Sequence, residues 1–201
     1  MTPVHRKTLF QEASLSQRDS VAAMLARAFA VDPAMSFIFP DAAVRARRMP
    51  HLFRLLYASD FRAGTVFVSD SCRAATLWRA PGRSKVPLLE TVAGAPAFLA
   101  ALGPAVARAI RVSHAIESHM PRGRFWYLHI AGCDPAAQGK GLGGGAIRAG
   151  LDRFGRMEDC YLETATEGNI GIYNRLGFEV IDTWTVSGGG PRFWSMLRPA
   201  G

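Results

Sequence analysis

The chain has 201 residues, of which 49% are hydrophobic and 20% charged, and its formal net charge is +8. This composition is typical of a single folded domain over residues 1–201 and excludes a largely disordered protein. The basic residues are mostly scattered arginines, and the densest stretch, 44–54, has the spacing of a solvated helix face. The charge alone therefore predicts no nucleic-acid partner.

The sequence also bears on compartment and on metal binding. No run of residues approaches 18 consecutive apolar positions, and the N-terminal MTPVHRKTLFQEAS lacks the apolar core and cleavage site of a signal peptide. The three cysteines, Cys72, Cys133 and Cys160, lack CxxC spacing. We therefore expect a cytoplasmic protein with no membrane partner and no metal site.

The N-terminal region predicts a strand and a helix. A short strand is expected over 8–13, and Ser16 and Asp19 then form the pattern of a capping box. An apolar stripe at helical spacing follows and predicts the first helix. The stripe consists of Val21, Met24, Leu25, Ala28 and Phe29.

A second helix is expected after a break. Asp32 and Pro33 end the first helix, and the apolar residues 33–39 follow without a predicted element. An amphipathic pattern then predicts a helix over 42–61, which Pro50 must kink or divide because proline lacks the amide hydrogen that a helix interior needs.

The middle of the chain predicts a hairpin and a helical region. Residues 65–69 and 74–79 are two β-rich runs joined by a short turn. Residues 86–119 are mostly helical in pattern, and we interpret them as a possible insertion that covers or shapes a pocket.

The C-terminal half predicts a crossover between parallel strands. The apolar, aromatic run 124–133 predicts a central strand, and a helix after it leads to a short strand at 160–163. Strands at 179–186 and 192–197 follow a short helix that Gly177 ends. Together with the hairpins, this order predicts a mixed sheet.

Between the central strand and the next helix lies the glycine-rich stretch QGKGLGGG, residues 138–145. A flexible linker, a surface for close helix packing and a cradle for an anion are the three alternatives. The cradle is favoured, since glycines let backbone amides approach an oxyanion and a helix N-terminus adds partial positive charge. Within the stretch, we expect Gly144 and Gly145 to let the helix lie close to the cofactor and the sheet. Walker A is absent, and the GxGxxG spacing of Gly139, Gly141 and Gly144 is a weak signal without an acidic ribose ligand, although Glu163 is near the required distance.

The stretch CDPAAQGKGLG resembles the pyrophosphate-binding motif Q/R-x-x-G-x-G/A of the GCN5-related N-acetyltransferases, the GNAT superfamily, with Gln138, Gly141 and Gly143 in register. LETATEGNIGIYNRLGF (162–178) resembles the segment that follows in that family. AFAVDPAMSFIFPD (28–41), ATLWRAPG (75–82) and FWSMLRP (193–199) are more loosely similar to the subgroup that includes puromycin N-acetyltransferase. The central helical region is not matched.

This resemblance implies an α/β (α+β) fold of three layers. Its mixed, mostly antiparallel sheet has about seven strands, which are splayed between strands 4 and 5, with helices on both faces. It also implies acetyl-CoA as the cofactor and Tyr173 as the general acid. The implied cofactor-binding residues are Ile130, Ala131, Gly132, Cys133, Gln138, Gly139, Lys140, Gly141, Leu142, Gly143, Gly144, Asn169 and Tyr173.

The residues themselves support an acid at Tyr173. Asn169 and Tyr173 are four residues apart and so share one helix face. Transfer of an acyl group to an amine expels a thiolate, and a phenol with a reference pKa of about 10 is protonated at neutral pH and can donate to it. The structural alternative is a packed tyrosine whose hydroxyl is hydrogen-bonded.

A base is needed because an alkyl ammonium must lose a proton before it attacks. Glu163, at the end of a short strand, is the best candidate, and a structural ion pair with an arginine is its alternative. His129 is a rival base, and it would otherwise be a structural histidine. Asp32, Trp78 and His129 are weaker candidates for lining an acceptor site, with core packing as the more ordinary role for Trp78.

Direct transfer is favoured, because no histidine stands at a readable spacing from Cys133 to make it a nucleophile. The sequence therefore predicts an acetyl-CoA-dependent N-acetyltransferase that acts on a primary amine of a small molecule, neutral or with one positive charge, as a monomer or homodimer. The alternative is a non-catalytic acyl-CoA-binding sensor or interaction module with the same fold.

Overall fold

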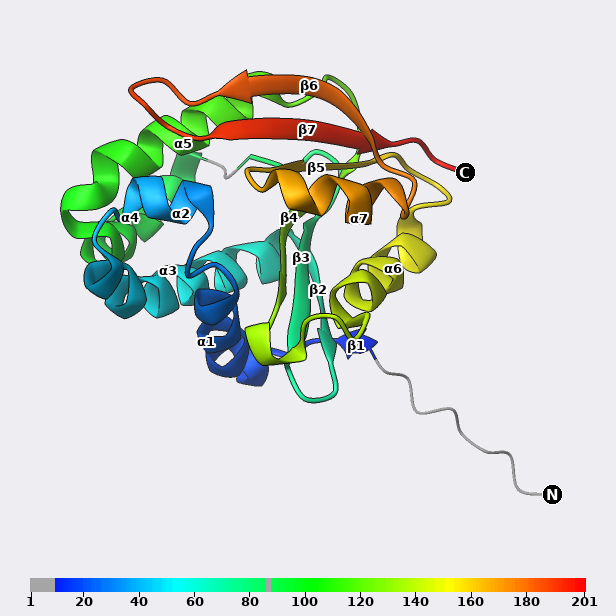
Figure 1. The fold of residues 1–201 in the computed structure, drawn as a ribbon, viewed down its shortest axis with the longest axis horizontal. Coiled ribbons are helices and arrows are strands. Elements are labelled where there is room, and N and C mark those ends of the chain that lie inside the picture. Colours follow the sequence, from blue (N-terminus) through cyan, green and yellow to red (C-terminus); the bar gives the residue numbers. More distant parts are fainter. Residues whose placement is uncertain (1–9, 86–87) are drawn as a thin grey trace.

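The computed structural model describes residues 10–85 and 88–201, and within them seven strands form one sheet in the order β1-β2-β3-β4-β5-β7-β6 (Figure 1). The predicted strand at 8–13 is observed in part, since residues 8 and 9 lie outside the described residues. The strands are β1 (Phe10–Glu12), β2 (Gly64–Ser69), β3 (Ala74–Arg79), β4 (Trp126–Cys133), β5 (Cys160–Thr164), β6 (Glu179–Thr185) and β7 (Arg192–Arg198).

The pairing confirms the predicted mixed sheet. β4 and β5 run parallel, as the crossover requires, and every other neighbouring pair is antiparallel. The sequence did not indicate that β7 lies between β5 and β6, which separates β5 from the strand that follows it in the chain.

The sheet opens between β4 and β5, as expected. Two residue pairs are in register between these strands, Trp126 with Cys160 and Tyr127 with Tyr161. β4 continues for six residues to Cys133, still paired with β3, whereas β5 continues paired with β7. The two strands therefore diverge near the middle of the sheet.

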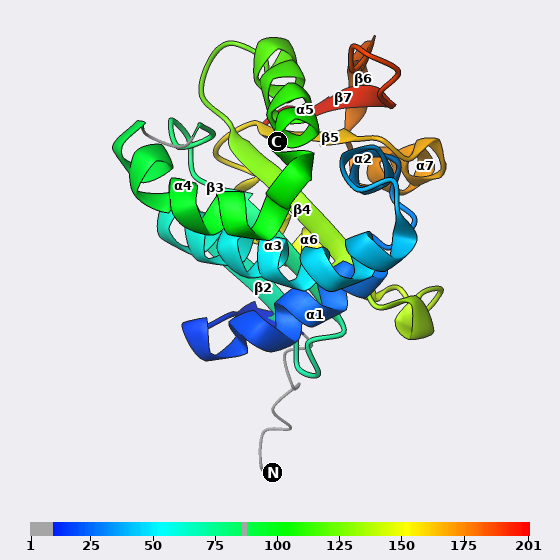
Figure 2. The ribbon, with the colours of Figure 1, turned by 90° about the vertical axis from the view of Figure 1, so that its left-hand side faces the viewer.

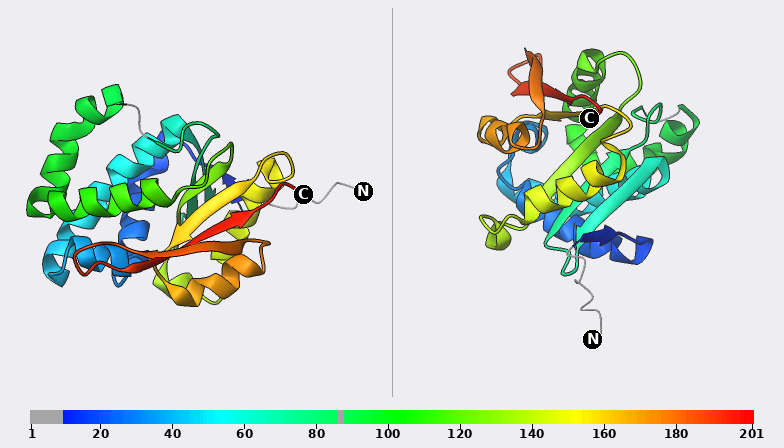
Figure 3. Two further views of the ribbon diagram at one scale, coloured as in Figure 1. Left: turned by 90° about the horizontal axis from the view of Figure 1, so that it is seen from above. Right: turned by 90° about the vertical axis from the view of Figure 1, so that its right-hand side faces the viewer.

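Helices cover both faces of the sheet, which gives the three predicted layers. α1 and α3 pack on one face of β2–β4, and α6 packs on the opposite face (Figures 2 and 3). The helices are α1 (Arg18–Ala28), α2 (Pro33–Ile38), α3 (Ala42–Ala63), α4 (Leu88–Leu102), α5 (Val106–His119), α6 (Leu142–Phe154) and α7 (Ile170–Asn174).

Two N-terminal predictions need correction. The capping pattern belongs to Ser14 and Gln17, whose side-chain Oε1 accepts from the Ser14 amide at 2.9 Å, rather than to Ser16 and Asp19. Of the two expected effects of Pro50, division of the helix is not observed: α3 continues from Ala42 to Ala63, since packing of its buried face compensates for one missing amide hydrogen bond.

Helix α2 was not predicted. Asp32 and Pro33 do not end the first helix, because α1 ends at Ala28 and residues 29–31 form a turn. The Asp32 carboxylate instead caps α2 by accepting from the Met35 amide at 2.9 Å. Pro33 occupies the first position, where its missing amide hydrogen is not needed. The Asp-Pro pair is thus the start of a helix rather than the end of one.

The predicted helical region is observed as α4 and α5. Gly94–His119 is the one helical stretch of the described residues that suits a membrane span by length and composition, with a mean hydropathy of 1.3. It is not one straight rod, because Gly103, at φ +53°, lies between the two helices, which run at an angle to each other (Figures 2 and 3). A helix of a water-soluble protein meets the same criteria, so the stretch carries no conclusion about a membrane.

Helix α6 lies close to the sheet because it carries glycines at its contact points. A Cβ at Gly145 would lie 2.4 Å from the ring of Phe10 on β1, and one at Gly150 would lie 2.6 Å from the ring of Trp78 on β3. A Cβ at Gly144 would meet no atom within 4 Å. The packing role predicted for Gly145 is therefore confirmed, whereas Gly144 has no such contact.

We expect Gly150→Ala to lower the free energy of unfolding by about 1–3 kcal/mol, because the methyl group would overlap the buried Trp78 ring. Gly144→Ala in the same helix is the matched control, and it should raise stability by up to about 1 kcal/mol through helix propensity. Urea unfolding of both variants measures the difference. Equal effects would contradict the packing.

Candidate functional site

A cavity of about 810 Å³ lies where β4 and β5 diverge. Its walls come from the α1–α2 connection, the end of β4, the glycine-rich loop with the start of α6, and the residues around α7. The cavity therefore lies beside the open edge of β4, where the parallel ladder has ended.

The glycine-rich loop presents amides to this cavity. Gly139 and Gly141 both have φ of +76°, a conformation that other residues adopt only with strain, and a Cβ on either would meet no atom within 4 Å. Gly141 precedes α6 and accepts the first helical hydrogen bond from Gly145 at 2.9 Å. The amides of residues 142–144 thus have no carbonyl partner in the helix and are available to an anion.

Most of the predicted cofactor residues line the cavity. Ile130 does not, because its side chain is buried in the core between the sheet and α1, and Lys140 is exposed outside the lining. The predicted residues that do line the cavity are Ala131, Gly132, Cys133, Gln138, Gly139, Gly141, Leu142, Gly143, Gly144, Asn169 and Tyr173.

Sequence reasoning missed several lining residues. On α6, Ile147 and Arg148 follow Gly144 by three and four positions, and around α7 the lining residues follow the same spacing from Asn169. Helical periodicity counted from the motif residues would have found both sets. The missed residues are Ala28, Phe29, Val31, Pro33, Ala137, Ile147, Arg148, Thr166, Ile172, Arg175 and Leu176.

Tyr173 is a buried phenol on one side of the opening. Its ring packs edge-on against Phe178, with ring centroids 6.2 Å apart, and the residue also lines the cavity. Burial, followed by the negative charges of Glu163 and Asp32, raises the pKa of Tyr173 to about 12. The hydroxyl is therefore fully protonated at neutral pH.

Glu163 is a buried carboxylate on β5. The Tyr127 hydroxyl donates a hydrogen bond to Oε1, whereas Oε2 is buried and has no partner among the described residues. Burial raises the pKa of Glu163 to about 7, although the hydrogen bond from Tyr127 and the charge of His129 act in the opposite direction. Within residues 10–85 and 88–201 no arginine forms an ion pair with it, so the structural alternative has no support there.

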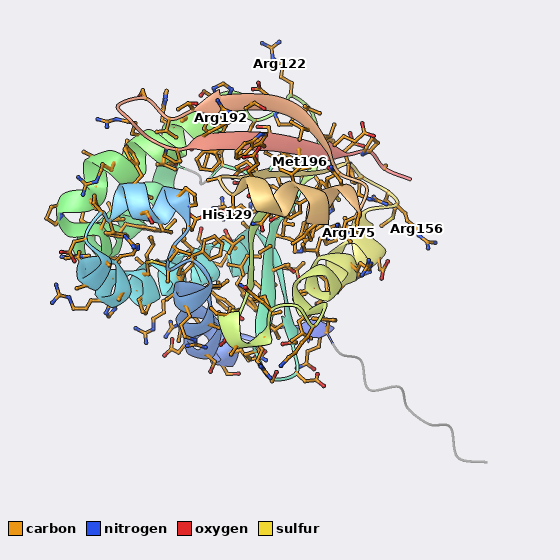
Figure 4. All side chains as sticks on the ribbon, viewed as in Figure 1. Arg122, His129, Arg156, Arg175, Arg192 and Met196 are labelled. Atoms are coloured by element: carbon orange, nitrogen blue, oxygen red, sulfur yellow. The ribbon has the colours of Figure 1, made fainter. Side chains whose placement is uncertain are left out.

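His129 lies on β4 near Glu163, between α2 and α7 in the view of Figure 4. Its Nδ1 is 2.7 Å from Oδ2 of Asp60 on α3, and its side chain is 24% exposed. The exposed arginines labelled in the same figure, such as Arg122 and Arg156, point away from this region. His129 is thus the partly accessible member of a buried polar cluster.

The other two weaker acceptor candidates, Asp32 and Trp78, have different positions. Asp32 lines the cavity beside its capping hydrogen bond, and burial raises its pKa against the effect of the Met35 and Ala34 amides. Trp78 is fully buried under α6, with its indole nitrogen donating to Thr76 at 3.0 Å. The expectation that Trp78 lines an acceptor site is therefore wrong, because its ring is part of the core.

Comparison with known proteins gives one sequence match and several structural ones. No protein-family model matches the sequence. Mycothiol acetyltransferase of Mycolicibacterium gilvum is 35% identical over 65 residues, which are 28% of this chain and 22% of that protein. The chain thus spans under a quarter of the length of this relative.

Two solved structures match over nearly the whole chain. The Corynebacterium glutamicum structure described as histone acetyltransferase HPA2 and related acetyltransferase is 25% identical, with a TM-score of 0.72 and 96% of both chains covered. Arylalkylamine N-acetyltransferase 2 of Aedes aegypti has a TM-score of 0.60 at 12% identity, covering 96% of this chain and 98% of that one, and so supports the fold alone. With the splayed sheet and the glycine-rich loop, these findings show that the chain has the fold of the GNAT superfamily of acetyltransferases, whose members use acetyl-CoA.

Proposed function

We propose that the chain transfers the acetyl group of acetyl-CoA directly to a primary amine of a small molecule. One observation carries this proposal: the sheet opens after two residue pairs between β4 and β5, beside a helix start with three available amides. An extended thiol arm fits along the open edge of β4, and a pyrophosphate fits at the helix N-terminus. One cavity joins the two places.

The cofactor would be held mainly by backbone groups. Residues 130–133 offer the free edge of β4 to the pantetheine arm, and the amides of 138–144 offer hydrogen bonds to the pyrophosphate. Asn169 faces the same cavity as Tyr173. Arg148 and Arg175 add positive charge to the lining, which favours phosphate groups, and Lys140 is given no direct role.

The chemistry removes two protons from the nitrogen and supplies one to the sulfur. Glu163 takes the first proton from the acceptor ammonium, and the amine nitrogen then bonds to the thioester carbonyl carbon. The carbon–sulfur bond breaks, Tyr173 donates its proton to the leaving thiolate, and the second proton of the nitrogen returns to the Tyr173 oxygen and restores the phenol. The buried Oε2 of Glu163 and the protonated phenol of Tyr173 support these roles.

The acceptor is inferred as a small amine that is neutral or carries one positive charge. Glu163 and Asp32 provide local negative charge within a chain of net charge +8. The puromycin N-acetyltransferase-like subgroup and the monomer or homodimer stay predictions. The non-catalytic sensor is disfavoured because Tyr173 lines the cavity and Glu163, which does not line it, is near enough for its charge to raise the pKa of Tyr173. A binding module needs neither group.

A panel of amines tests the proposal. Tyramine, puromycin, agmatine, spermidine and a peptide with a free N-terminus are incubated with acetyl-CoA, and release of CoA thiol is measured. We expect turnover with a monoamine and tight binding of acetyl-CoA by calorimetry. Acetyl-CoA binding without turnover on any amine would favour the sensor, and absence of binding would contradict both functions.

Gly141→Glu is expected to weaken acetyl-CoA binding by at least about tenfold, since it strains a positive-φ position and places a carboxylate beside the pyrophosphate. Gly189→Glu is the matched control, because Gly189 has φ +77° and equally open surroundings in the turn between β6 and β7. Calorimetry of acetyl-CoA binding to both variants measures the two Kd values, and the Kd of Gly189→Glu should equal that of the wild type. An unchanged Kd for Gly141→Glu would remove the loop from the cofactor site.

Tyr173→Phe should lower the rate of CoA release by about 10²–10⁴-fold and leave the acetyl-CoA Kd unchanged, because it removes only the donated proton. Tyr57→Phe serves as the control. Tyr57, on α3, is also a buried phenol, but its hydroxyl donates to the Ser14 carbonyl at 2.7 Å and the residue does not line the cavity. A wild-type rate in Tyr173→Phe would refute the general-acid role.

Glu163 should make stability depend on pH. Its pKa is about 7 in the fold against 4.5 for the ordinary group, so the protonated form stabilises the fold and this contribution is lost as pH rises through 7. Glu163→Gln does not titrate. Between pH 5 and 8.5 its free energy of unfolding, relative to wild type, should therefore rise by about 2–3 kcal/mol. Urea unfolding at both pH values checks this, and a constant difference would show that Glu163 is not buried as described.

A further inference from the structure

A cluster of polar side chains lies between Glu163 and α3. The Tyr127 hydroxyl donates to Glu163, and the Tyr127 ring lies 5.2 Å from the His129 ring, measured between centroids. His129 Nδ1 contacts Asp60 Oδ2 at 2.7 Å, and the other carboxylate oxygen, Oδ1, accepts from Arg79 Nε at 2.6 Å. Arg79 also donates to Ser59 at 2.7 Å. Asp60 and Arg79 are almost wholly buried, so this cluster removes two charges from water and is held by close pairing.

A β-bulge aims His129 at this cluster. Leu77 on β3 is opposite Ile130, but the next residue, Trp78, is opposite Leu128, so His129 is the extra residue on β4. Bulges redirect side chains, and here two consecutive residues, His129 and Ile130, face α1 and α3. The bulge therefore places an imidazole on the same face as Asp60, near the opening between β4 and β5.

Asp60 fixes which imidazole nitrogen carries a proton. Burial raises the pKa of Asp60, but the charges of His129 and Arg79, with their hydrogen bonds, outweigh burial and hold it below its usual value. An ionised carboxylate only accepts hydrogen bonds, so Nδ1 of His129 must be the donor. Nε2 is then the nitrogen that can accept a proton.

Glu163 needs a way to lose the proton that it takes from each amine. Its side chain is buried, and the titratable groups near enough to interact with its charge are Tyr127 and His129 on β4, Tyr161 on β5 and Tyr173 on α7. Burial is the main cause that raises the pKa of each of the three phenols, so none can act as a base at neutral pH. His129 is partly exposed and has an available nitrogen.

We propose that His129, positioned by Asp60, relays the proton from Glu163 to solvent after each transfer. In this step the O–H bond of the Glu163 carboxyl breaks, and an N–H bond forms at Nε2 of His129, directly or through one water. The imidazolium is stabilised by Asp60 and then releases the same proton to bulk water. Glu163 is a carboxylate again, and no other reactant is consumed.

This inference rests on the proposed acetyl transfer, and pre-steady-state kinetics separate the two. At pH 8.5, above its pKa of about 7, Glu163 is already ionised before the first turnover, so His129→Gln should release the first equivalent of CoA at the wild-type rate. Later turnovers should be slower by about tenfold or more, and added imidazole should restore them. The probe is acetyl-CoA with the fastest amine of the panel.

Three results would overturn the relay. The first is a first turnover in His129→Gln that is as slow as the later ones, which would make His129 a base or a structural residue. The second is a steady state equal to wild type, and the third is a slow steady state that imidazole does not restore. A wild-type chain that binds acetyl-CoA but releases no CoA contradicts the acetyl transfer itself, and the relay with it. An unchanged acetyl-CoA Kd in His129→Gln serves as the folding control.

A second measurement tests Asp60 without any acceptor. Nitrogen-15 NMR of the wild-type chain should show the neutral His129 ring protonated on Nδ1. In Asp60→Asn, Arg79 retains the single amide oxygen, so the amide NH₂ faces the ring and the proton should move to Nε2. A wild-type ring protonated on Nε2, or an unchanged tautomer in a folded Asp60→Asn, would overturn the positioning role.

Discussion

The short parallel ladder between β4 and β5 is the constraint on which the rest of the site depends. Two residue pairs join the strands, and beyond Tyr127 and Tyr161 their backbones diverge. A gap in the middle of a sheet leaves backbone groups without partners, which costs free energy unless something else binds them. Pairing of β4 with β3 and of β5 with β7 keeps each half of the sheet intact on either side of the gap.

The divergence also separates the two proton transfers. Glu163, His129 and Asp60 lie toward α3, whereas Tyr173 packs with Phe178 and Met196 on the opposite face. A thioester in the gap would therefore meet a base on one face and an acid on the other. Both groups are buried, so electrostatic interactions between them and a substrate are stronger than in water.

Local pattern was sufficient to predict much of this arrangement. The glycine-rich stretch between a buried strand and an amphipathic helix indicated the anion cradle, and the four-residue spacing of Asn169 and Tyr173 placed both on one wall of the cavity. The crossover predicted the parallel pair, and period-two runs predicted the hairpins. These features depend on residues close together in the chain.

Contacts between distant residues were not predictable. His129 contacts Asp60, which lies 69 positions away in the chain, and the contact depends on a bulge in β4. No sequence pattern predicts the contact or the bulge. Trp78 was misassigned because a tryptophan in a strand can face a pocket or a helix, and only Gly150 on α6 decides which. α2 was missed because six residues are too few to show a helical period, so its cap at Asp32 was interpreted only as a break.

A crystal structure of the chain with CoA is the most direct test of the central claim. The pantetheine arm should lie between β4 and β5 along residues 130–133, the pyrophosphate on the amides of 138–144, and the sulfur beside the Tyr173 hydroxyl. The Glu163 and His129 side chains should lie on the far side of the sulfur. CoA bound elsewhere, or with β4 and β5 closed into a continuous ladder, would contradict it.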